Sequence, residues 1–383
     1  MKDIAIFGST GSIGRNALDV VKHFPDQFRI TALTTNSNIA LLEKQIRRFC
    51  PLFAGVSDTK AAASLEKKKL YGTKIFSGEE GLAALAAEKK IDKVLLAISG
   101  AAALRPLLSA IENNKDIALA NKEALVMAGP LVMRLAGKKK AKIIPVDSEQ
   151  SAIWQCLEGA DLKDLKNIYL TASGGPFRDV KKHDFKGISV GQVLKHPRWK
   201  MGRKITVDSA TLANKGLELL EAMFLFNVAR EKIKVLIHPE AVIHSMVEFV
   251  DGVVLAQLSA TDMRIPIQYA LSYPERLENA LPRLDFPKLK ALHFHAPDFE
   301  KFPCLKLAFQ VARDLGTAPA VFNAANEIAV EEFLKNKLNF ISIPRVIEKV
   351  LSRHALKTNP GLNDIWQADI WARNEASKIC LRS

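Results

Sequence analysis

Ile4-Ala5-Ile6-Phe7-Gly8-Ser9-Thr10-Gly11-Ser12-Ile13-Gly14 is the stretch that decides the fold of the first part of the chain. Its four leading apolar residues predict a buried strand, and the apolar side formed by Ala17, Leu18 and Val21 predicts a helix after it. Glycine at three-residue intervals lets the backbone approach a phosphate group at the N-terminus of that helix. The pattern therefore predicts a dinucleotide-binding strand–turn–helix unit, with a glycine-rich turn that binds nothing as the alternative.

A second strand is expected over residues 28–33, and it ends in Thr34-Thr35-Asn36-Ser37-Asn38. An NAD-binding enzyme usually places an acidic residue about 20 residues after the glycine turn, where it binds the ribose hydroxyls. Here the strand end is neutral, so no carboxylate repels a 2′-phosphate. The loop favours NADPH over NADH, although it contains no arginine to bind that phosphate.

Further apolar segments alternate with helical segments that are rich in alanine, leucine and lysine. We expect strands at residues 52–56, 74–76, 93–98, 116–120 and 142–146. This alternation predicts a doubly wound parallel sheet, whose ligands bind beyond the carboxyl ends of the strands. Two polar clusters follow such strand ends, Ser99-Gly100 and Asn121-Lys122-Glu123, and the second is also suited to capping a helix.

Two carboxylates follow the last of these strands, in Val146-Asp147-Ser148-Glu149-Gln150. In an extended segment, side chains two residues apart point the same way, so Asp147 and Glu149 are expected to face one point. Hard oxygen ligands suit Mg²⁺ or Mn²⁺. Asp and Ser are also favoured at helix N-termini, and a helix is expected from Ser151, so capping is the alternative interpretation.

Past residue 161 the sequence predicts a strand at residues 167–171, followed by Ser173-Gly174-Gly175. Successive backbone N–H groups and a hydroxyl in such a turn suit an anion, although an ordinary tight turn is also consistent with it. The segment His196-Pro197-Arg198-Trp199-Lys200-Met201-Gly202 has the composition of a loop that closes over a ligand.

A helix is expected near residues 207–218, and Ser209, Asn214 and Lys215 in it supply donors that suit a phosphate. Glu218 lies one helical turn after Lys215 and is a candidate third carboxylate for the metal. Strands are then expected at residues 234–238, 245–250 and 253–258, and Asp251-Gly252 predicts a hairpin. Exposed edges of this smaller sheet are suited to pairing across a dimer.

The composition is that of an ordinary globular protein of 383 residues, 48% hydrophobic and 25% charged. The formal charge of +14 comes with short lysine runs but with no nucleic-acid-binding motif, so no nucleic acid is expected as a partner. No signal peptide and no membrane-spanning run is recognised, so no membrane association is expected. Four scattered cysteines without a Cys-x-x-Cys pair fit a reducing cytoplasm.

The motifs together resemble the 1-deoxy-D-xylulose 5-phosphate reductoisomerase family, and in the family's order they cover most of the chain. The resemblance rests on the glycine turn, Asn121-Lys122-Glu123, Asp147-Ser148-Glu149, Ser173-Gly174-Gly175-Pro176-Phe177, His196-Pro197-Arg198-Trp199, Val207-Asp208-Ser209-Ala210-Thr211, Asn214-Lys215-Gly216-Leu217-Glu218, Ile237-His238-Pro239 and Phe322-Asn323-Ala324-Ala325-Asn326-Glu327. It implies an NADPH- and metal-dependent enzyme that rearranges and reduces 1-deoxy-D-xylulose 5-phosphate to 2-C-methyl-D-erythritol 4-phosphate, in isoprenoid precursor biosynthesis.

The resemblance also implies roles for individual residues. A Mg²⁺ or Mn²⁺ ion would be held by Asp147, Glu149 and Glu218. The substrate phosphate would be bound by Ser173, Ser209, Asn214 and Lys215. Further substrate contacts would come from Lys122, Ser148 and His196. Lys122 and His196 would also be catalytic, together with the three metal ligands. A flap over the reaction would carry Trp199 and Met201. The cofactor would be contacted by Thr10, Gly11, Ser12, Ile13, Asn36, Ser37, Asn38, Asn121, Glu123 and Gly202.

The fold class expected is α/β. A Rossmann-like NADPH-binding domain over residues 1–147 is followed by an α+β catalytic and dimerisation domain over 148–272, a linker over 273–303 and a C-terminal helical bundle over 304–383. Helical spacing is expected at residues 304–315, 318–334 and 343–351. The family implies a homodimer. The alternative is an NADP-dependent dehydrogenase of a phosphorylated substrate that performs no rearrangement.

Two positions depart from the family pattern. Many members carry Arg or Lys where Ser37 stands, and the family commonly has proline where Thr261 precedes Asp262-Met263-Arg264. The first departure concerns recognition of the 2′-phosphate. The second lies away from the expected metal ligands.

Overall fold

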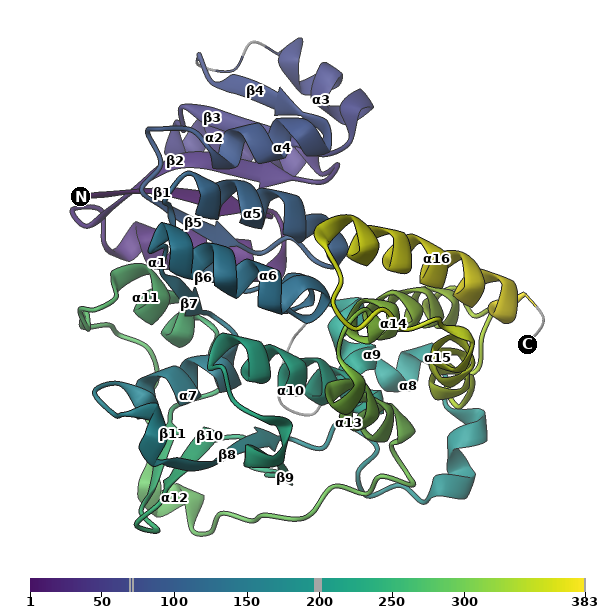
Figure 1. Cartoon of the computed structure of the whole chain (residues 1–383). Coiled ribbons are helices and arrows are strands. Elements are labelled where there is room, and N and C mark those ends of the chain that lie inside the picture. The colour runs from purple at the N-terminus through teal and green to yellow at the C-terminus, as the bar shows by residue number, and fades with distance from the viewer. Residues whose placement is uncertain (69, 71, 196–201, 382–383) are drawn as a thin grey trace. The chain divides into compact units, whose positions relative to one another are not determined.

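A seven-stranded parallel sheet is formed by the first part of the chain in the computed structural model, which describes residues 1–68, 70, 72–195 and 202–381 (Figure 1). Its strand order is β4-β3-β2-β1-β5-β6-β7. The strands are β1 (Lys2–Phe7), β2 (Phe28–Thr35), β3 (Phe53–Val56), β4 (Lys74–Ser77), β5 (Lys93–Leu96), β6 (Asp116–Leu119) and β7 (Ile143–Pro145). Every strand expected from the sequence in this region is therefore confirmed, as is the doubly wound parallel arrangement.

Helices connect these strands. They are α1 (Ser12–His23), α2 (Ile39–Phe49), α3 (Thr59–Glu66), α4 (Gly78–Ala86), α5 (Leu104–Glu112) and α6 (Glu123–Lys139). The helix α7 (Ser148–Leu157) follows the last strand, β7. The apolar residues of the central strands β1, β2, β5 and β6 are buried, because parallel strands are covered by helices on both faces of the sheet, whereas those of edge strand β4 are only partly buried.

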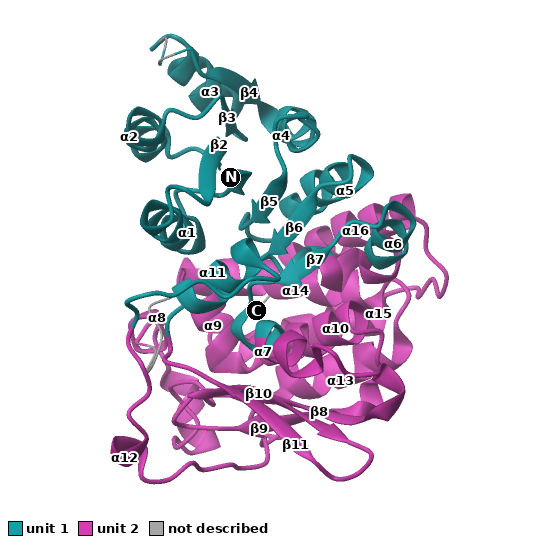
Figure 2. Ribbon diagram, turned by 90° about the vertical axis from the view of Figure 1, so that its left-hand side faces the viewer, with its two compact units in different colours: residues 1–124, 132–151, 262–281 teal, residues 125–131, 152–261, 282–383 magenta. Residues whose placement is uncertain are grey.

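Two compact units make up the chain (Figure 2). Unit 1 comprises residues 1–124, 132–151 and 262–281, and unit 2 comprises residues 125–131, 152–261 and 282–383. Both units are therefore built from segments that are distant in the sequence. The four-segment division expected from the sequence stays a prediction.

The strand order reverses direction between β1 and β5, at the centre of the sheet of unit 1. At such a switch point the turns after the two strands leave a crevice for a ligand. Gly8 follows β1 with φ +86°, and a Cβ at this position would lie 2.5 Å from the carbonyl oxygen of Ala97. Only glycine allows the two turns to approach this closely, because any side chain would collide with backbone.

A late segment of the chain returns to unit 1 as α11 (Arg264–Ser272). The buried ammonium of Lys93 donates to the carbonyl oxygens of Ala270 (2.9 Å) and Leu271 (3.2 Å), at the C-terminal end of this helix. Burial lowers the pKa of Lys93 to about 8, because the charged form loses its hydration. Arg264 forms ion pairs with Asp262 (2.7 Å) and Asp19 (2.9 Å).

Unit 2 contains a four-stranded mixed sheet of order β11-β10-β8-β9. Its strands are β8 (Leu165–Ala172), β9 (Ile233–Ile237), β10 (Ile243–Phe249) and β11 (Val254–Leu258). The antiparallel pairing of β10 with β11 confirms the hairpin predicted from Asp251-Gly252. β11 is an edge strand, and its outer residues are exposed.

Helices account for most of the remainder of unit 2. They are α8 (Val190–Val193), α9 (Arg203–Thr211), α10 (Ala213–Leu225), α12 (Phe286–Leu289), α13 (Pro303–Asp314), α14 (Ala318–Leu334), α15 (Ser342–Arg353) and α16 (Leu362–Cys380). The three helices expected after residue 303 are confirmed, and α16 is a further helix beyond them. α14 packs against both α15 and α16. Within the described ranges, no helix combines the length and the apolar composition that crossing a bilayer requires.

Candidate active site

The glycine turn of unit 1 is anchored to the end of β2. Ser9 is buried, and its hydroxyl donates to the carbonyl oxygen of Thr34 (3.0 Å). The hydroxyls of Thr10 and Thr35 lie 2.7 Å apart and share a hydrogen bond. Gly11 occupies the N-cap of α1, and because glycine has no side chain, it supplies no oxygen to the N–H groups of the first helical turn. These N–H groups and the helix dipole suit an anion.

The loop after β2 contains three residues expected to contact the cofactor. Asn36 and Ser37 are exposed. Asn38 is the N-cap of α2, and its side-chain oxygen accepts a hydrogen bond from the N–H of Leu41 (3.2 Å). The local structure therefore explains Asn38 as a helix cap, and its contact with a cofactor stays a prediction.

Asn121 links the ends of two neighbouring strands of unit 1. Its amide donates to the carbonyl oxygens of Ile98 (2.8 Å) and Gly100 (3.1 Å), which follow β5, and to the carboxylate of Glu123 (2.9 Å). Its side-chain oxygen accepts from the N–H of Ala124 (2.8 Å) and so caps α6. Asn121 therefore fixes the loop after β5 to the beginning of α6.

The extended backbone expected at Asp147 and Glu149 is wrong, but their carboxylates do face one point, because an oxygen of each lies within 4.8 Å of the other. α7 begins at Ser148, three residues earlier than expected, so Ser148 and Glu149 occupy its first turn directly after Asp147. The N–H of Ser151 bonds to the carbonyl oxygen of Asp147 (2.8 Å), which begins the helix. Ser, Asp and Glu at a helix N-terminus stabilise helical over extended backbone because they complement its free N–H groups and its dipole.

The donor set of this turn fits a hard divalent cation. Oδ2 of Asp147 is buried and forms an ion pair with Nζ of Lys122, 2.5 Å away. Among the described residues, Oδ2 accepts no hydrogen bond of regular geometry. Glu149 accepts a hydrogen bond from the hydroxyl of Ser148 (2.5 Å). Carboxylate oxygens are hard ligands of the kind that Mg²⁺ and Mn²⁺ prefer.

Unit 2 brings the Ser173 turn against the end of α9. Gly174 (φ +84°) and Gly175 (φ +69°) both adopt left-handed backbone conformations. A Cβ at Gly175 would lie 2.9 Å from the carbonyl oxygen of Ser209, so the turn and the helix that carries Ser209 are in close contact. Two residues expected to bind one phosphate therefore lie on adjoining segments.

The helix expected near residues 207–218 is broken at Leu212, which has φ +57° and separates α9 from α10. The break starts a new helix at Ala213 and places Asn214 and Lys215 in its first turn. Asn214 donates to Oε1 of Glu218 (2.5 Å), and the ammonium of Lys215 pairs with Oε2. Lys215 and Glu218 are 3% and 0% exposed, so this ion pair is buried.

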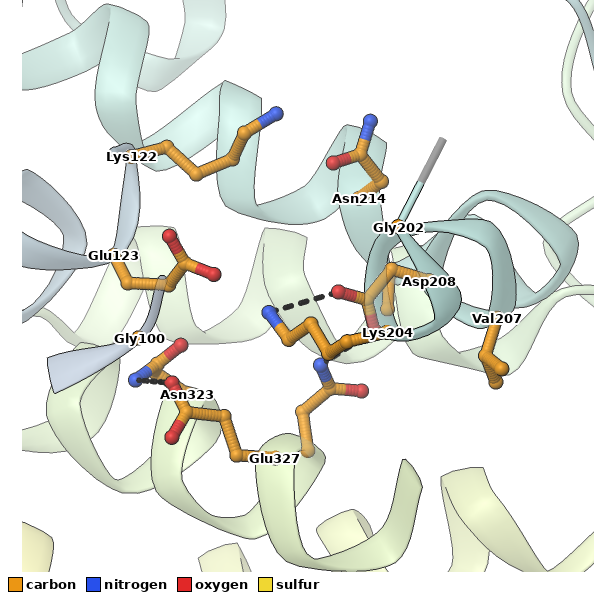
Figure 3. Close-up of polar contacts among 12 residues, drawn as sticks. Gly100, Lys122, Glu123, Gly202, Lys204, Val207, Asp208, Asn214, Asn323 and Glu327 are labelled. Atoms are coloured by element: carbon orange, nitrogen blue, oxygen red, sulfur yellow. Dashed lines mark hydrogen bonds and ion pairs between the residues drawn. The ribbon is translucent and has the colours of Figure 1, made fainter. Parts of the chain in front are cut away.

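A buried polar network connects α9 with α14, and the sequence pattern does not predict it. Asp208 is 1% exposed and forms an ion pair with Lys204 (2.8 Å) (Figure 3). It also accepts a hydrogen bond from Asn326 of α14 (2.8 Å). On the same helix, Asn323 donates to Glu327 (3.1 Å). Asp208 precedes Ser209 directly, so the network fixes the helix that presents Ser209. Asp208 and Asn326 each lie in a motif of the family, but no local signal shows that residues 118 apart in the sequence meet.

Two further contacts extend the network to the last helix. Arg373 of α16 forms ion pairs with Glu327 (2.6 Å) and Asp369 (2.8 Å). A chain of charge-assisted contacts thus connects α14 and α16 within unit 2. Of the other expected site residues, His196, Trp199 and Met201 lie outside the described residues, and Gly202 is the N-cap of α9.

The switch-point turn of unit 1 and the carboxylate and donor clusters of both units define a Rossmann-type, nucleotide-dependent α/β enzyme. Sequence models described as 1-deoxy-D-xylulose 5-phosphate reductoisomerase and its C-terminal domains match residues 4–129, 143–226 and 258–375. The chain belongs to the 1-deoxy-D-xylulose 5-phosphate reductoisomerase family.

Relatives match along the whole chain. The reductoisomerase of Caldanaerobacter subterraneus subsp. tengcongensis is 50% identical and covers 100% of both chains. That of Pelotomaculum thermopropionicum is 48% identical over 99% of this chain and 98% of its own. A crystal structure of DOX-P reductoisomerase in complex with NADPH, fosmidomycin and magnesium has a TM-score of 0.94 at 41% identity and covers 100% of this chain and 98% of that one. The Zymomonas mobilis enzyme in complex with NADPH has a TM-score of 0.92 at 39% identity, covering 99% of each chain.

Proposed function

We propose that this chain rearranges 1-deoxy-D-xylulose 5-phosphate and reduces the product with NADPH to 2-C-methyl-D-erythritol 4-phosphate. The observation that carries the proposal is full-length similarity to reductoisomerases at 48–50% identity, with every motif quoted above present. The solved relative in complex with NADPH, fosmidomycin and magnesium supports the same cofactor and ion for this chain.

Asp147, Glu149 and Glu218 are the proposed ligands of a Mg²⁺ or Mn²⁺ ion. When bound, the ion supplies Lewis acidity toward the substrate's carbonyl oxygen. The buried Oδ2 of Asp147 and the buried carboxylate of Glu218, which is paired with the Lys215 ammonium, support this role. Lys122, paired with Asp147, is proposed to orient the carboxylate and to contact the substrate.

The substrate phosphate is proposed to bind in unit 2. Ser173 and Ser209 lie on segments in close contact, and Asn214 and Lys215 begin the next helix. Hydroxyl, amide and ammonium donors of this kind make charge-assisted hydrogen bonds to phosphate. Ser148 and His196 are proposed as further substrate contacts, and a flap bearing Trp199 and Met201 is proposed to exclude water.

NADPH is proposed to place its diphosphate on the turn of unit 1. The open N-terminus of α1 and the close approach of Gly8 to Ala97 support this position. The neutral loop after β2 supports NADPH over NADH. The proposed contacts are Thr10, Gly11, Ser12, Ile13, Asn36, Ser37, Asn38, Asn121, Glu123 and Gly202.

The function is tested by following NADPH absorbance with 1-deoxy-D-xylulose 5-phosphate, with and without Mn²⁺. We expect oxidation that requires the ion, and NMR of the product that shows a branched carbon skeleton. A product with the unbranched skeleton would instead identify a dehydrogenase. Absence of metal-dependent oxidation in the purified protein would refute the assignment.

A homodimer in a reducing cytoplasm completes the proposal. Edge strand β11 supports the dimer, because Val254 is 45% and Leu255 is 46% exposed, and an apolar edge is suited to pairing. Four free thiols support the compartment. Leu255→Lys is expected to shift the protein to monomers in light scattering after size exclusion. Leu162→Lys, at a position 47% exposed elsewhere in unit 2, is the control that should leave the mass unchanged.

A further inference from the structure

A cavity lies entirely within unit 2, and none of the site residues proposed above lines it. It is bounded by the 3₁₀ turn at Lys182–Gly187, the start of α13 and the start of α15. Its volume is about 540 Å³. Cavities of roughly 300–1,000 Å³ are the size that binds small organic ligands.

The floor of this cavity is apolar and aromatic. The ring centroids of Phe185 and Phe302 are 6.0 Å apart, and those of Phe185 and Phe340 are 5.8 Å apart. All three rings are buried, and Leu307 and Cys304 complete the floor. An alkyl chain or an aromatic ring placed there would be removed from water, which favours binding by about 0.8 kcal/mol for each CH₂ buried.

The rim of the cavity is positively charged. The lining contains two acids, Glu300 and Glu348, and five cations, which are Lys182, Lys186, Lys301, Lys306 and Arg345. With His183 neutral, the formal charge of the lining is therefore +3. Glu300 is shared between Lys306 (3.3 Å) and Lys182 (4.0 Å). In the part of the chain that the structure describes, Lys186 and Arg345 form no ion pair.

Uncompensated cations beside an apolar floor distinguish this cavity from an ordinary basic surface. A lysine run on a solvated helix face attracts anions without offering an apolar surface. An apolar pocket without charge accepts neutral molecules. We propose that this cavity is a second binding site, which takes an amphiphilic anion: an apolar chain or ring that ends in a phosphate or carboxylate.

The surroundings of the cavity connect it to the Ser173 turn. Phe177, four residues after Ser173, packs against Phe340 (5.3 Å) and Phe185 (5.9 Å). Thr211, which ends α9, also lines the cavity. The floor and the proposed phosphate-binding segments therefore share one aromatic cluster. The binding proposal itself does not depend on the proposed function.

Calorimetric titration of the full-length protein with octyl phosphate tests the proposal. Butyl phosphate, 1-octanol and inorganic phosphate are the comparison probes. We expect octyl phosphate to bind at least about tenfold more tightly than butyl phosphate, because four CH₂ groups are added, and more tightly than 1-octanol or inorganic phosphate. Equal affinity for octyl and inorganic phosphate, or no binding of octyl phosphate, would overturn the proposal.

Charge reversal locates the binding. The double variant Lys186→Glu, Arg345→Glu changes exposed side chains, so folding is expected to be preserved. It should weaken octyl phosphate binding by about tenfold or more, because the anion then meets like charges. Lys349→Glu, an exposed residue of α15 outside the cavity lining, is the matched control and should bind as the unmodified protein does. Octyl phosphate binding that survives the double variant would place the ligand elsewhere and refute the cavity as its site.

Discussion

Glu218→Gln probes the buried charge that connects the proposed phosphate and metal sites. The carboxylate is fully buried, accepts a hydrogen bond from Asn214 (2.5 Å) and pairs with the ammonium of Lys215. Removing one partner of a buried ion pair costs about 3–5 kcal/mol, because the other charge is left uncompensated. The glutamine oxygen still accepts one hydrogen bond, so we expect a loss near the lower limit, about 3 kcal/mol, without metal.

Metal binding gives the variant a second, separable signature. At an ion concentration about 100 times its dissociation constant, Mn²⁺ adds about 2.7 kcal/mol to the free energy of unfolding of a protein that binds it only when folded. Glu218→Gln removes a charged ligand, so this increment should nearly vanish. Turnover should fall by more than the 10–100-fold typical of removing a residue that merely supports a metal ligand.

The assay is urea denaturation with EDTA and with excess Mn²⁺, together with NADPH oxidation. Glu248→Gln is the matched control, because Glu248 also accepts hydrogen bonds, from Tyr169 (2.6 Å) and Asn167 (2.7 Å), but is not one of the proposed ligands. Glu248→Gln should keep the full Mn²⁺ increment. An increment in Glu218→Gln equal to that of the unmodified protein would show that Glu218 is not a ligand.

Three further changes test other parts of the structure. Because the pKa of Lys93 is about 8 in the folded protein and 10.5 in its ordinary state, the unfolded chain binds more protons between these values. The free energy of unfolding should therefore rise with pH in this range. Between about pH 7.5 and 9.5 it should rise by about 2 kcal/mol more in the unmodified protein than in Lys93→Met, as measured by denaturation curves of both proteins. Asp208→Asn weakens the pair with Lys204, so we expect KM for the sugar phosphate to rise more than kcat falls; an unchanged KM would separate this network from Ser209. Ser37→Arg adds a cation beside the proposed 2′-phosphate, so NADPH should bind roughly tenfold more tightly with no change for NADH in fluorescence titrations, and equal gains for both would contradict this placement.

Local features of the sequence were sufficient for much of this fold. Apolar runs that alternate with helical segments predicted every strand of the parallel sheet, and Asp251-Gly252 predicted the hairpin. These predictions succeed because strand, turn and helix preferences act over a few residues. The extended interpretation of Asp147 and Glu149 failed at the same scale. An extended strand has a side-chain period of two residues, but here the capping residues begin a helix at Ser148. The capping preference therefore determined the backbone conformation.

What the sequence determined by itself was therefore the order of elements, the nucleotide-binding turn and the inventory of acids and donors. Only the tertiary structure decided which distant segments meet. α11 returns to unit 1, where its carbonyl groups accept from buried Lys93, and Asn326 reaches Asp208 across 118 residues. Contacts of this kind depend on the packing of whole elements. The loss of hydration of a buried charge is offset by partners far along the chain. Such partners leave no periodic pattern near the residues they stabilise.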